Sequence, residues 1–213
     1  EELSMLQSLR ARLIAVCVTI TFISLLTLAA AIFFVVRSNT LEAADTRISQ
    51  LTAARAEQVA AWAQDKQRIT GALKAVVGHP EPVPFLLRTK EAGGLDNAFY
   101  VQADKTAVFP KPRPPEYDGT ARPWYKLAVS TGGPAITPAY TDTTTGKLTI
   151  SFVEPAKGAD GQLLAVVGSD VHLTGIAEQV ASIRPTEKSF AFMVDDAGKI
   201  LAYSKPELVL KPV

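Results

Sequence analysis

The stretch Ala121–Asp142, "ARPWYKLAVSTGGPAITPAYTD", gathers an arginine, three aromatic rings and a carboxylate in a chain otherwise rich in alanine, valine, leucine and threonine. Its segment Arg122–Thr131 is predicted to be a short helix, because proline is tolerated in a first helical turn and Gly-Gly-Pro ends the segment. Core packing would account for the rings but gives no role to the charges. The stretch therefore raises the question of whether it packs or binds.

Downstream of this stretch, the pattern changes to that of an antiparallel sheet. Strands are predicted at Ile136–Thr141, Lys147–Glu154 and Gln162–Asp170, joined by the glycine-bearing turns TTTG and GADG. Consecutive strands with short turns form an antiparallel sheet with one buried face. A further helix is expected at Leu173–Ile183.

Upstream of it, Ala98–Gln102 and Thr106–Pro110 are predicted to form a hairpin, followed by a proline-rich loop over Pro110–Gly119. Lys188–Ser204 has a similar build, with DDAG at its turn, which suggests a duplicated module. Because two strands cannot bury a core, we expect residues 184–213 to be the start of a truncated second module.

An apolar run near the N-terminus, Leu13–Val36, holds 24 residues without a charge. A helix rising about 1.5 Å per residue would span roughly 36 Å over this length, enough for a hydrocarbon core of about 30 Å. The run is longer than the apolar core of a signal peptide and lacks a clear cleavage site. We interpret it as an uncleaved transmembrane anchor, with a buried helix of a soluble protein as the alternative. Arg10 and Arg12 precede the run, and Arg37 and Arg47 follow it. Because the number of arginines is the same on both sides, the positive-inside rule does not give the orientation of the helix in the membrane.

The polar stretch that follows the anchor, residues 38–77, has no proline and carries apolar residues at helical spacing. This apolar stripe consists of Leu41, Ile48, Leu51, Val59, Trp62, Ile69, Leu73 and Val76. It predicts one long helix, which must bury its stripe against a domain or a partner helix. Gly78–Pro84, "GHPEPVP", is expected to end the helix, because glycine and proline do not continue it.

Composition argues against several classes of function. The 213 residues carry a net charge of +1, which gives no field for attracting nucleic acid, so no nucleic-acid partner is expected. The single cysteine, Cys17, lies in the apolar run, and two histidines are too few for a histidine-rich metal cluster; we expect no metal and no cofactor. Ser169, Asp170 and His172 include the residue types of a catalytic triad, but neighbours on a strand point to opposite faces. No glycine-rich phosphate loop is present, and we expect the chain not to be an enzyme.

Together these features resemble the double Cache (dCache) region, the extracytoplasmic ligand-binding part of many bacterial methyl-accepting chemotaxis receptors. The best-matched segments are "EYDGTARPWYKLAVSTGGPAITPAYTD" and "GQLLAVVGSDVHL"; Ala139 and Ala165 depart from the family's pattern. The resemblance implies an α+β fold with an N-terminal transmembrane helix, a long stalk helix and antiparallel-sheet, PAS-like Cache modules. The implied organisation is a cytoplasmic N-terminus at 1–12, a transmembrane helix at 13–36, a stalk helix at 37–78, a membrane-distal ligand-binding module at 79–183, and the start of a membrane-proximal module at 184–213.

Members of this family that recognise free amino acids carry a tyrosine, then Arg-x-Trp-Tyr, then Tyr-x-Asp, then an aspartate at the end of a later strand. Carried over by position, this signature implies the ligand-binding residues Tyr117, Arg122, Trp124, Tyr125, Tyr140, Asp142 and Asp170. All of them are present, in the order of the signature.

The residue types also suit a free α-amino acid on chemical grounds, since each of its charges needs a partner of opposite sign once water is excluded. The guanidinium of Arg122 suits the carboxylate, and the carboxylates of Asp142 and Asp170 suit the ammonium. Structural alternatives stay open: the Trp-Tyr pair could be core of the short helix, Arg122 could be a surface arginine, Asp142 could cap the TDTTTG turn, and Asp170 could cap the helix that follows it.

The resemblance implies the sensing part of a transmembrane chemoreceptor in the bacterial inner membrane, with a periplasmic or extracellular sensor that binds an amino acid and controls chemotaxis. The expected partners are the amino acid, the membrane, a second copy in a homodimer, and cytoplasmic signalling proteins reached through a C-terminal part beyond residue 213. The alternatives are the same sensor on a histidine kinase or diguanylate cyclase, and a protein-binding ectodomain without a small ligand.

Overall fold

The chain consists of a long N-terminal helix followed by an α+β domain. The computed structural model describes residues 9–184, 188–195 and 197–213. Residues 1–8 of the predicted N-terminal segment, residues 185–187 of the predicted second module and Asp196 of the predicted DDAG turn lie outside the described residues. Backbone contacts divide the chain into two compact units, Glu1–Glu57 and Gln58–Val213.

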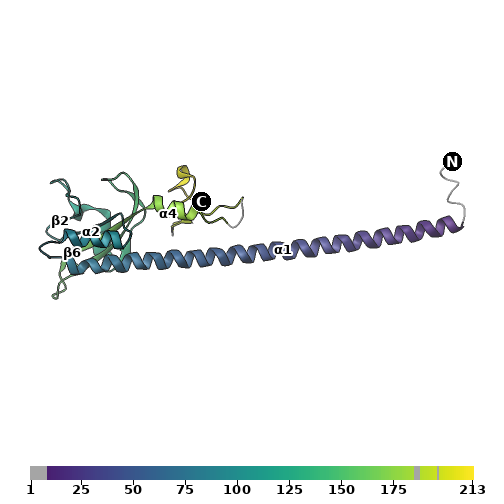
Figure 1. Ribbon diagram of the computed structural model, residues 1–213, viewed down its shortest axis with the longest axis horizontal. Helices are drawn as coiled ribbons and strands as arrows, with labels where there is room; N and C mark the ends of the chain where they lie inside the picture. The colour runs from purple at the N-terminus through teal and green to yellow at the C-terminus, as the bar shows by residue number, and fades with distance from the viewer. Residues whose placement is uncertain (1–8, 185–187, 196) are drawn as a thin grey trace. The chain divides into compact units, whose positions relative to one another are not determined.

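The first unit is formed by helix α1, which begins at Leu9 and ends at Ala72 in the second unit (Figure 1). The helix is long and apolar enough to cross a membrane: an 18-residue window has a mean hydropathy of 2.5, and none of that window is buried within the described chain. The hydroxyls of Thr19, Thr21, Ser24 and Thr27 donate to carbonyl oxygens four residues earlier at 2.8–3.0 Å. The polar side chains of the apolar run are thus satisfied inside the helix, as an apolar surrounding requires.

Only the second half of the predicted apolar stripe is buried in the second unit. Trp62 and Ile69 pack against its core, and Leu73 is fully buried. The first four stripe residues are exposed, namely Leu41, Ile48, Leu51 and Val59. Regular helix ends at Ala72, and a 3-10 turn, η2 (Leu73–Val76), continues the backbone close to the predicted end of the stalk helix.

The second unit is built on a six-stranded sheet. Its strands are β1 (Asn97–Gln102), β2 (Ala107–Val108), β3 (Ala135–Ile136), β4 (Tyr140–Thr141), β5 (Leu148–Lys157) and β6 (Leu163–His172). They lie in the order β2-β1-β6-β5-β3, with β4 also paired to β5, and every pair is antiparallel. The predicted α+β class, an apolar N-terminal helix with an antiparallel sheet, is confirmed.

Strand alternation gives the sheet two faces, because successive side chains point to opposite sides. The face that carries Phe152 packs against the end of α1, η2 and helix α2 (Val83–Ala92). The opposite face carries Val153 and packs against helix α3 (Pro123–Thr131). The 3-10 turn η3 (Gly119–Ala121) leads into α3, so the segment with the Arg-Pro-Trp-Tyr sequence covers this second face.

One strand of the sequence-based prediction is wrong. The single strand expected at Ile136–Thr141 is two short strands, β3 and β4, separated at Pro138, which has no N–H to donate to a ladder. The helix does end before Gly78–Pro84, as predicted, and a further helix, α2, begins within this segment at Val83 with Pro84 in its first turn. Proline is tolerated there because its missing N–H would have no partner within the helix.

After β6 the chain forms the predicted helix and hairpin. Helix α4 (Leu173–Ala181) is followed by β7 (Met193–Val194), β8 (Ile200–Ala202) and a 3-10 turn, η4 (Pro206–Leu208), and the two strands pair antiparallel. Ala202 belongs to the same buried cluster as residues of α4 and of the six-stranded sheet. The domain boundary expected between residues 183 and 184 stays a prediction.

Candidate ligand-binding site

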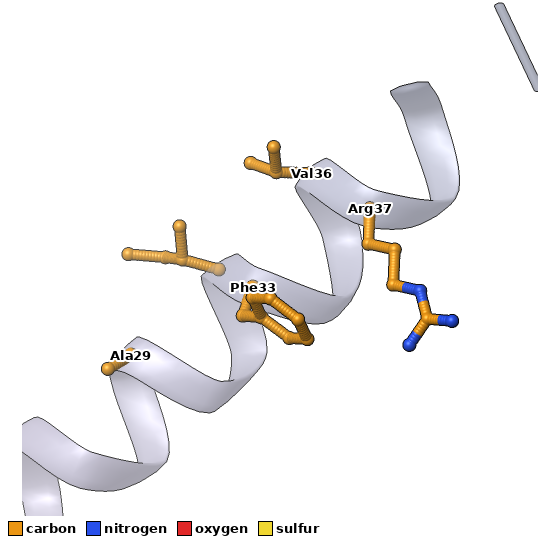
Figure 2. Close-up of a pocket in the computed structure, with 5 residues that line it drawn as sticks. Ala29, Phe33, Val36 and Arg37 are labelled. Atoms are coloured by element: carbon orange, nitrogen blue, oxygen red, sulfur yellow. The ribbon is translucent and has the colours of Figure 1, made fainter. Parts of the chain in front are cut away.

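One concave surface lies on the apolar part of α1 (Figure 2). It is lined by Ala29, Ile32, Phe33, Val36 and Arg37, all from a single helix. No second element of the described chain contributes to it, and Arg37 marks the end of the charge-free run. Apolar side chains with a cation at their edge suit contact with lipid, but they offer too few polar groups to orient a small ligand.

A polar pocket lies in the second unit, on the sheet face covered by α3. Its walls come from β1 and the segment after β2, the proline-rich loop (residues 110–119), the start of α3, β4 with the turn that follows, and the end of β6. The lining residues are Phe99, Phe109, Arg113, Tyr117, Arg122, Trp124, Tyr140, Asp142, Thr143 and Asp170. Two arginines and two aspartates beside aromatic rings are more than core packing requires, so this pocket is the candidate site.

The pocket brings together all but one of the residues predicted as ligand contacts. The exception is Tyr125, which is absent from the lining and is buried in the core cluster of this face. Its ring lies 5.8 Å from that of Trp124, centroid to centroid. Trp124 is buried in the same cluster, so both rings pack in the core, but adjacent helix residues point in different directions and Trp124 also reaches the pocket. The role of these residues in binding stays a prediction.

Asp170 is buried near the end of β6, with 7% of its surface exposed. Ser151 Oγ donates to Asp170 Oδ1 at 2.6 Å, and Asn97 Nδ2 donates to Oδ2 at 3.2 Å. Burial raises the pKa of Asp170 to about 6, and these two hydrogen bonds oppose the rise only in part. Because Asp170 lies inside the strand, it does not cap the helix that follows.

Tyr140 extends this hydrogen-bonded network. Its hydroxyl lies 2.7 Å from Ser151 Oγ, and since Ser151 gives its one hydrogen to Asp170, Tyr140 is the donor to Ser151. Burial raises the pKa of Tyr140, so the phenol keeps its proton. The network fixes the orientation of the Asp170 carboxylate and leaves it lone pairs for a further donor.

Asp142 begins the turn after β4, which we name the Asp142 turn (residues 142–146). Its carboxylate accepts hydrogen bonds from Thr144 N at 3.3 Å and from Thr145 N and Oγ1 at 3.0 and 2.7 Å. Burial would raise the pKa of Asp142, but these hydrogen bonds outweigh it and lower the pKa. The alternative of a turn cap is confirmed, and much of this carboxylate's acceptor capacity is used within the turn.

Two arginines reach the Asp142 turn from different segments. Arg122 Nη2 donates to Thr143 Oγ1 at 3.1 Å, and Arg113 Nη1 donates to Thr144 Oγ1. Arg113 is absent from the sequence-based prediction, because a lone arginine among prolines carries no pattern that marks it. The other lining residues missing from that prediction are Phe99, Phe109 and Thr143.

The pocket is narrow in this conformation. Its free space is about 10 Å³, which is room for about one water molecule. A ligand larger than water enters only if lining side chains move apart. The proline-rich loop and the Asp142 turn are the walls without regular secondary structure, and they carry Arg113, Tyr117 and Thr143.

An antiparallel sheet with a polar pocket under a loop-helix cover, preceded by an apolar helix, defines a sensor domain of the Cache or PAS-like class. Residues 84–178 match the family model described as the first PDC sensor domain of methyl-accepting chemotaxis protein-like proteins. Residues 84–178 are thus similar to a sensor domain of the methyl-accepting chemotaxis protein type, and the predicted resemblance is confirmed.

The individual relatives include chemoreceptors and one cyclase. Methyl-accepting chemotaxis protein McpG of Pseudomonas putida is 30% identical over 166 residues, covering 78% of this chain and 25% of McpG. The ligand-binding domain of the Pseudomonas fluorescens chemoreceptor CtaA, solved in complex with L-isoleucine, is 28% identical with a TM-score of 0.63, covering 74% of this chain and 67% of that chain. Adenylate cyclase 1 of Rhizobium meliloti is 32% identical over 88 residues, covering 41% of this chain and 13% of the cyclase. The chain therefore spans at most a quarter of the length of these two curated relatives.

Proposed function

We propose that the polar pocket binds a free α-amino acid as a zwitterion. The observation that carries the proposal is that the Arg122 guanidinium and the buried Asp170 carboxylate line one pocket. The guanidinium offers parallel donors for the ligand carboxylate. The Asp170 carboxylate has lone pairs left for the ligand ammonium beyond those used by Ser151 and Asn97. The complex of CtaA with L-isoleucine supports this class of ligand.

Aromatic residues of the pocket would complete the ligand's surroundings. The indole N–H of Trp124 and the phenol of Tyr117 are donors that could join Arg122 at the carboxylate. The face of the Tyr140 ring would attract the ammonium by a cation–π interaction. Tyr125 would act indirectly, by packing against Trp124 and holding its ring in place.

Binding of an amino acid would require movement of the pocket walls, because the free space holds only about one water molecule. We propose that the proline-rich loop and the Asp142 turn open and then close over the ligand. A ligand shifts such an equilibrium only if it binds the two conformers unequally. The contacts with Asp170 on the sheet and Arg122 on the cover would provide that difference in the closed form.

The wider proposal is that this chain is the sensing part of a transmembrane chemoreceptor that controls chemotaxis. Helix α1 would cross the bacterial inner membrane, with the sensor on its periplasmic or extracellular side, and the exposed part of the stripe would pack against a second copy in a homodimer. The similarity to McpG supports cytoplasmic signalling proteins as partners. The similarity to adenylate cyclase 1 favours one second candidate, the same sensor on a nucleotide cyclase. Chemotaxis assays and cyclic-nucleotide measurements on a deletion strain distinguish the two outputs.

A thermal-shift screen of the full chain in lipid nanodiscs tests ligand binding directly. An amino acid that binds, supplied at a hundred times its dissociation constant, is expected to add about 2.7 kcal/mol to the free energy of unfolding. The matched controls are its decarboxylated amine and its N-acetyl derivative, each of which lacks one charge and should give little shift. No shift with any of the twenty standard amino acids contradicts the proposal.

The affinity for the amino acid is expected to fall as the pH decreases through about 6. Burial raises the pKa of Asp170 to about 6, and only the ionised carboxylate pairs with an ammonium. Binding should therefore be about tenfold weaker at pH 5 than at pH 7.5, as measured by calorimetric titration. The matched control is His172→Gln, a change at the end of the same strand outside the pocket, which should keep the pH dependence. A flat profile over this range contradicts the role of Asp170.

A further inference from the structure

We propose that Arg113 determines specificity by binding an oxygen acceptor at the end of the ligand's side chain, so that the pocket favours a dicarboxylic amino acid over an aliphatic one. This inference rests on the proposed function, because it names the side chain of the ligand within the same pocket. Three observations carry it: Arg113 is held in place by its neighbours, it has a buried donor without a partner, and it forms no ion pair with a carboxylate among the described residues.

The guanidinium of Arg113 is positioned by aromatic rings and by one hydrogen bond. Its central carbon lies 4.1 Å from the ring centroid of Phe109 and 5.5 Å from that of Tyr117. Phe109 in turn stacks on Phe99 of β1 with centroids 4.7 Å apart, which anchors the platform to the sheet. Nη1 donates to the Thr144 hydroxyl. A guanidinium held in this way loses little conformational entropy when a ligand binds it.

One donor of this side chain is left over. Arg113 Nε is buried and has no hydrogen-bond partner in the part of the chain that the structure describes. A buried donor without a partner is unfavourable, and buried polar groups in folded proteins are generally paired. An oxygen of a ligand in the pocket that Arg113 lines would satisfy it.

The two arginines of the pocket have hydrogen-bonding capacity left for the carboxylates of an acidic ligand. Neither Arg113 nor Arg122 forms an ion pair with a carboxylate among the described residues. Asp142 contributes negative charge to the pocket, but it accepts three hydrogen bonds inside its own turn, which use much of its acceptor capacity. Asp170 remains as the carboxylate available to a ligand. Two guanidiniums outside any ion pair and one carboxylate with acceptor capacity to spare match, in hydrogen-bonding groups, a ligand with two carboxylates and one ammonium.

The two guanidiniums are close enough to serve one small ligand. Arg122 and Arg113 donate to the hydroxyls of consecutive residues, Thr143 and Thr144, so both lie at the Asp142 turn. With the α-carboxylate on Arg122, a side-chain carboxylate two or three carbons away would meet Arg113. An aliphatic side chain of the same size would leave the Nε donor unpaired.

Calorimetric titration of the full chain in nanodiscs with L-aspartate, L-asparagine and L-leucine tests this inference, because the three side chains are similar in size. The wild type is expected to bind aspartate at least tenfold more tightly than leucine, with asparagine between them. Arg113→Gln should lower the affinity for aspartate by about 10- to 100-fold and the affinity for leucine by less than about threefold. The matched control is Lys111→Gln, which removes an exposed cation from the same loop and should keep the preference.

Two further variants separate recognition from a structural role. Thr144→Val removes the hydrogen bond to Arg113 without removing the guanidinium, and should keep the preference for aspartate. Arg113→Lys keeps the charge, so it should retain a weaker preference; it carries the test if circular dichroism shows that Arg113→Gln does not fold. The inference is overturned if Arg113→Gln weakens all three ligands equally, or if Thr144→Val has the same effect. A wild type that binds aspartate and leucine equally overturns it but leaves the proposed function standing, whereas a wild type that binds no amino acid removes both.

Discussion

Arg122→Ala is expected to weaken the binding of any free amino acid by about 100- to 1000-fold, because the ligand carboxylate would be buried without its cation. The side chain is only partly buried, and its one hydrogen bond within the described residues goes to Thr143. Its loss should therefore leave the domain folded, with an unfolding free energy within about 1 kcal/mol of the wild type. Calorimetric titration of the full chain in nanodiscs measures the affinity, and circular dichroism checks the fold.

The matched control for this prediction is Lys126→Ala. Lys126 is an exposed cation on the same helix, α3, and it does not line the pocket. The Lys126→Ala variant should bind the amino acid as the wild type does, because a surface charge outside the pocket contributes little to the binding affinity. If Arg122→Ala bound normally, the ligand carboxylate would lie elsewhere. If Arg122→Ala unfolded the domain, the arginine would be structural.

Asp170→Asn is expected to abolish binding and, at the same time, to stabilise the unliganded domain. The amide cannot pair with an ammonium, so the affinity should fall by about 100-fold or more. In the unliganded protein, however, burial disfavours the ionised carboxylate and raises its pKa from 3.8 to about 6. That shift corresponds to about 3 kcal/mol at neutral pH, an upper value for the stability that the neutral amide would recover.

The direction of this stability change with pH can be checked. Between about pH 4 and pH 6 the folded state binds more protons at Asp170 than the unfolded state does, so wild-type stability falls as the pH rises through that window. The Asn variant lacks this titration. Its gain in unfolding free energy over the wild type should therefore be full above pH 6 and should vanish below pH 4. Urea denaturation at several pH values measures it. Asp65→Asn, the same change at an exposed position, should show no such gain. A variant that is less stable than the wild type at pH 7.5 would show that Asn97 and Ser151 require the carboxylate.

Much of the fold followed from local patterns. The period of two in the strands, the period of 3.6 in the stalk, and the Pro-Trp-Tyr start and glycine end of α3 all predict elements that the structure contains. Helix α2 was not predicted from local patterns. Proline normally ends a helix, and the sequence does not show that Pro84 lies in a first helical turn, where proline is tolerated. The division of the predicted strand into β3 and β4 at Pro138 was also not predicted. Proline has no N–H to donate to the strand ladder, and the alternation of apolar and polar residues does not reveal this missing donor.

The candidate site was likewise predicted only in part, because some of its features depend on neighbouring residues and others on contacts between distant segments. The order of charged and aromatic residues from Tyr117 to Asp170 is written along the chain, and six of the seven predicted residues meet in one pocket. Which member of the Trp124–Tyr125 pair faces that pocket depended on how α3 packs on the sheet. Arg113 had no local signal at all, since its partners Phe109, Tyr117 and Thr144 come together only when the loop folds over the sheet.

Residue types and their order along the chain predict an apolar helix of membrane-spanning length, an α+β fold, and a set of side chains whose charges suit the two charges of an amino acid. These features follow from residue type, spacing and hydrophobic period, which act over a few neighbouring positions. The difference in hydrogen bonding, burial and pKa between Asp142 and Asp170 became visible in the folded structure alone. One is tied into its own turn, and the other is buried on the sheet with its pKa raised. The physical reason is that burial and hydrogen bonding depend on segments far apart in the chain, and these terms set the charge and the availability of a carboxylate.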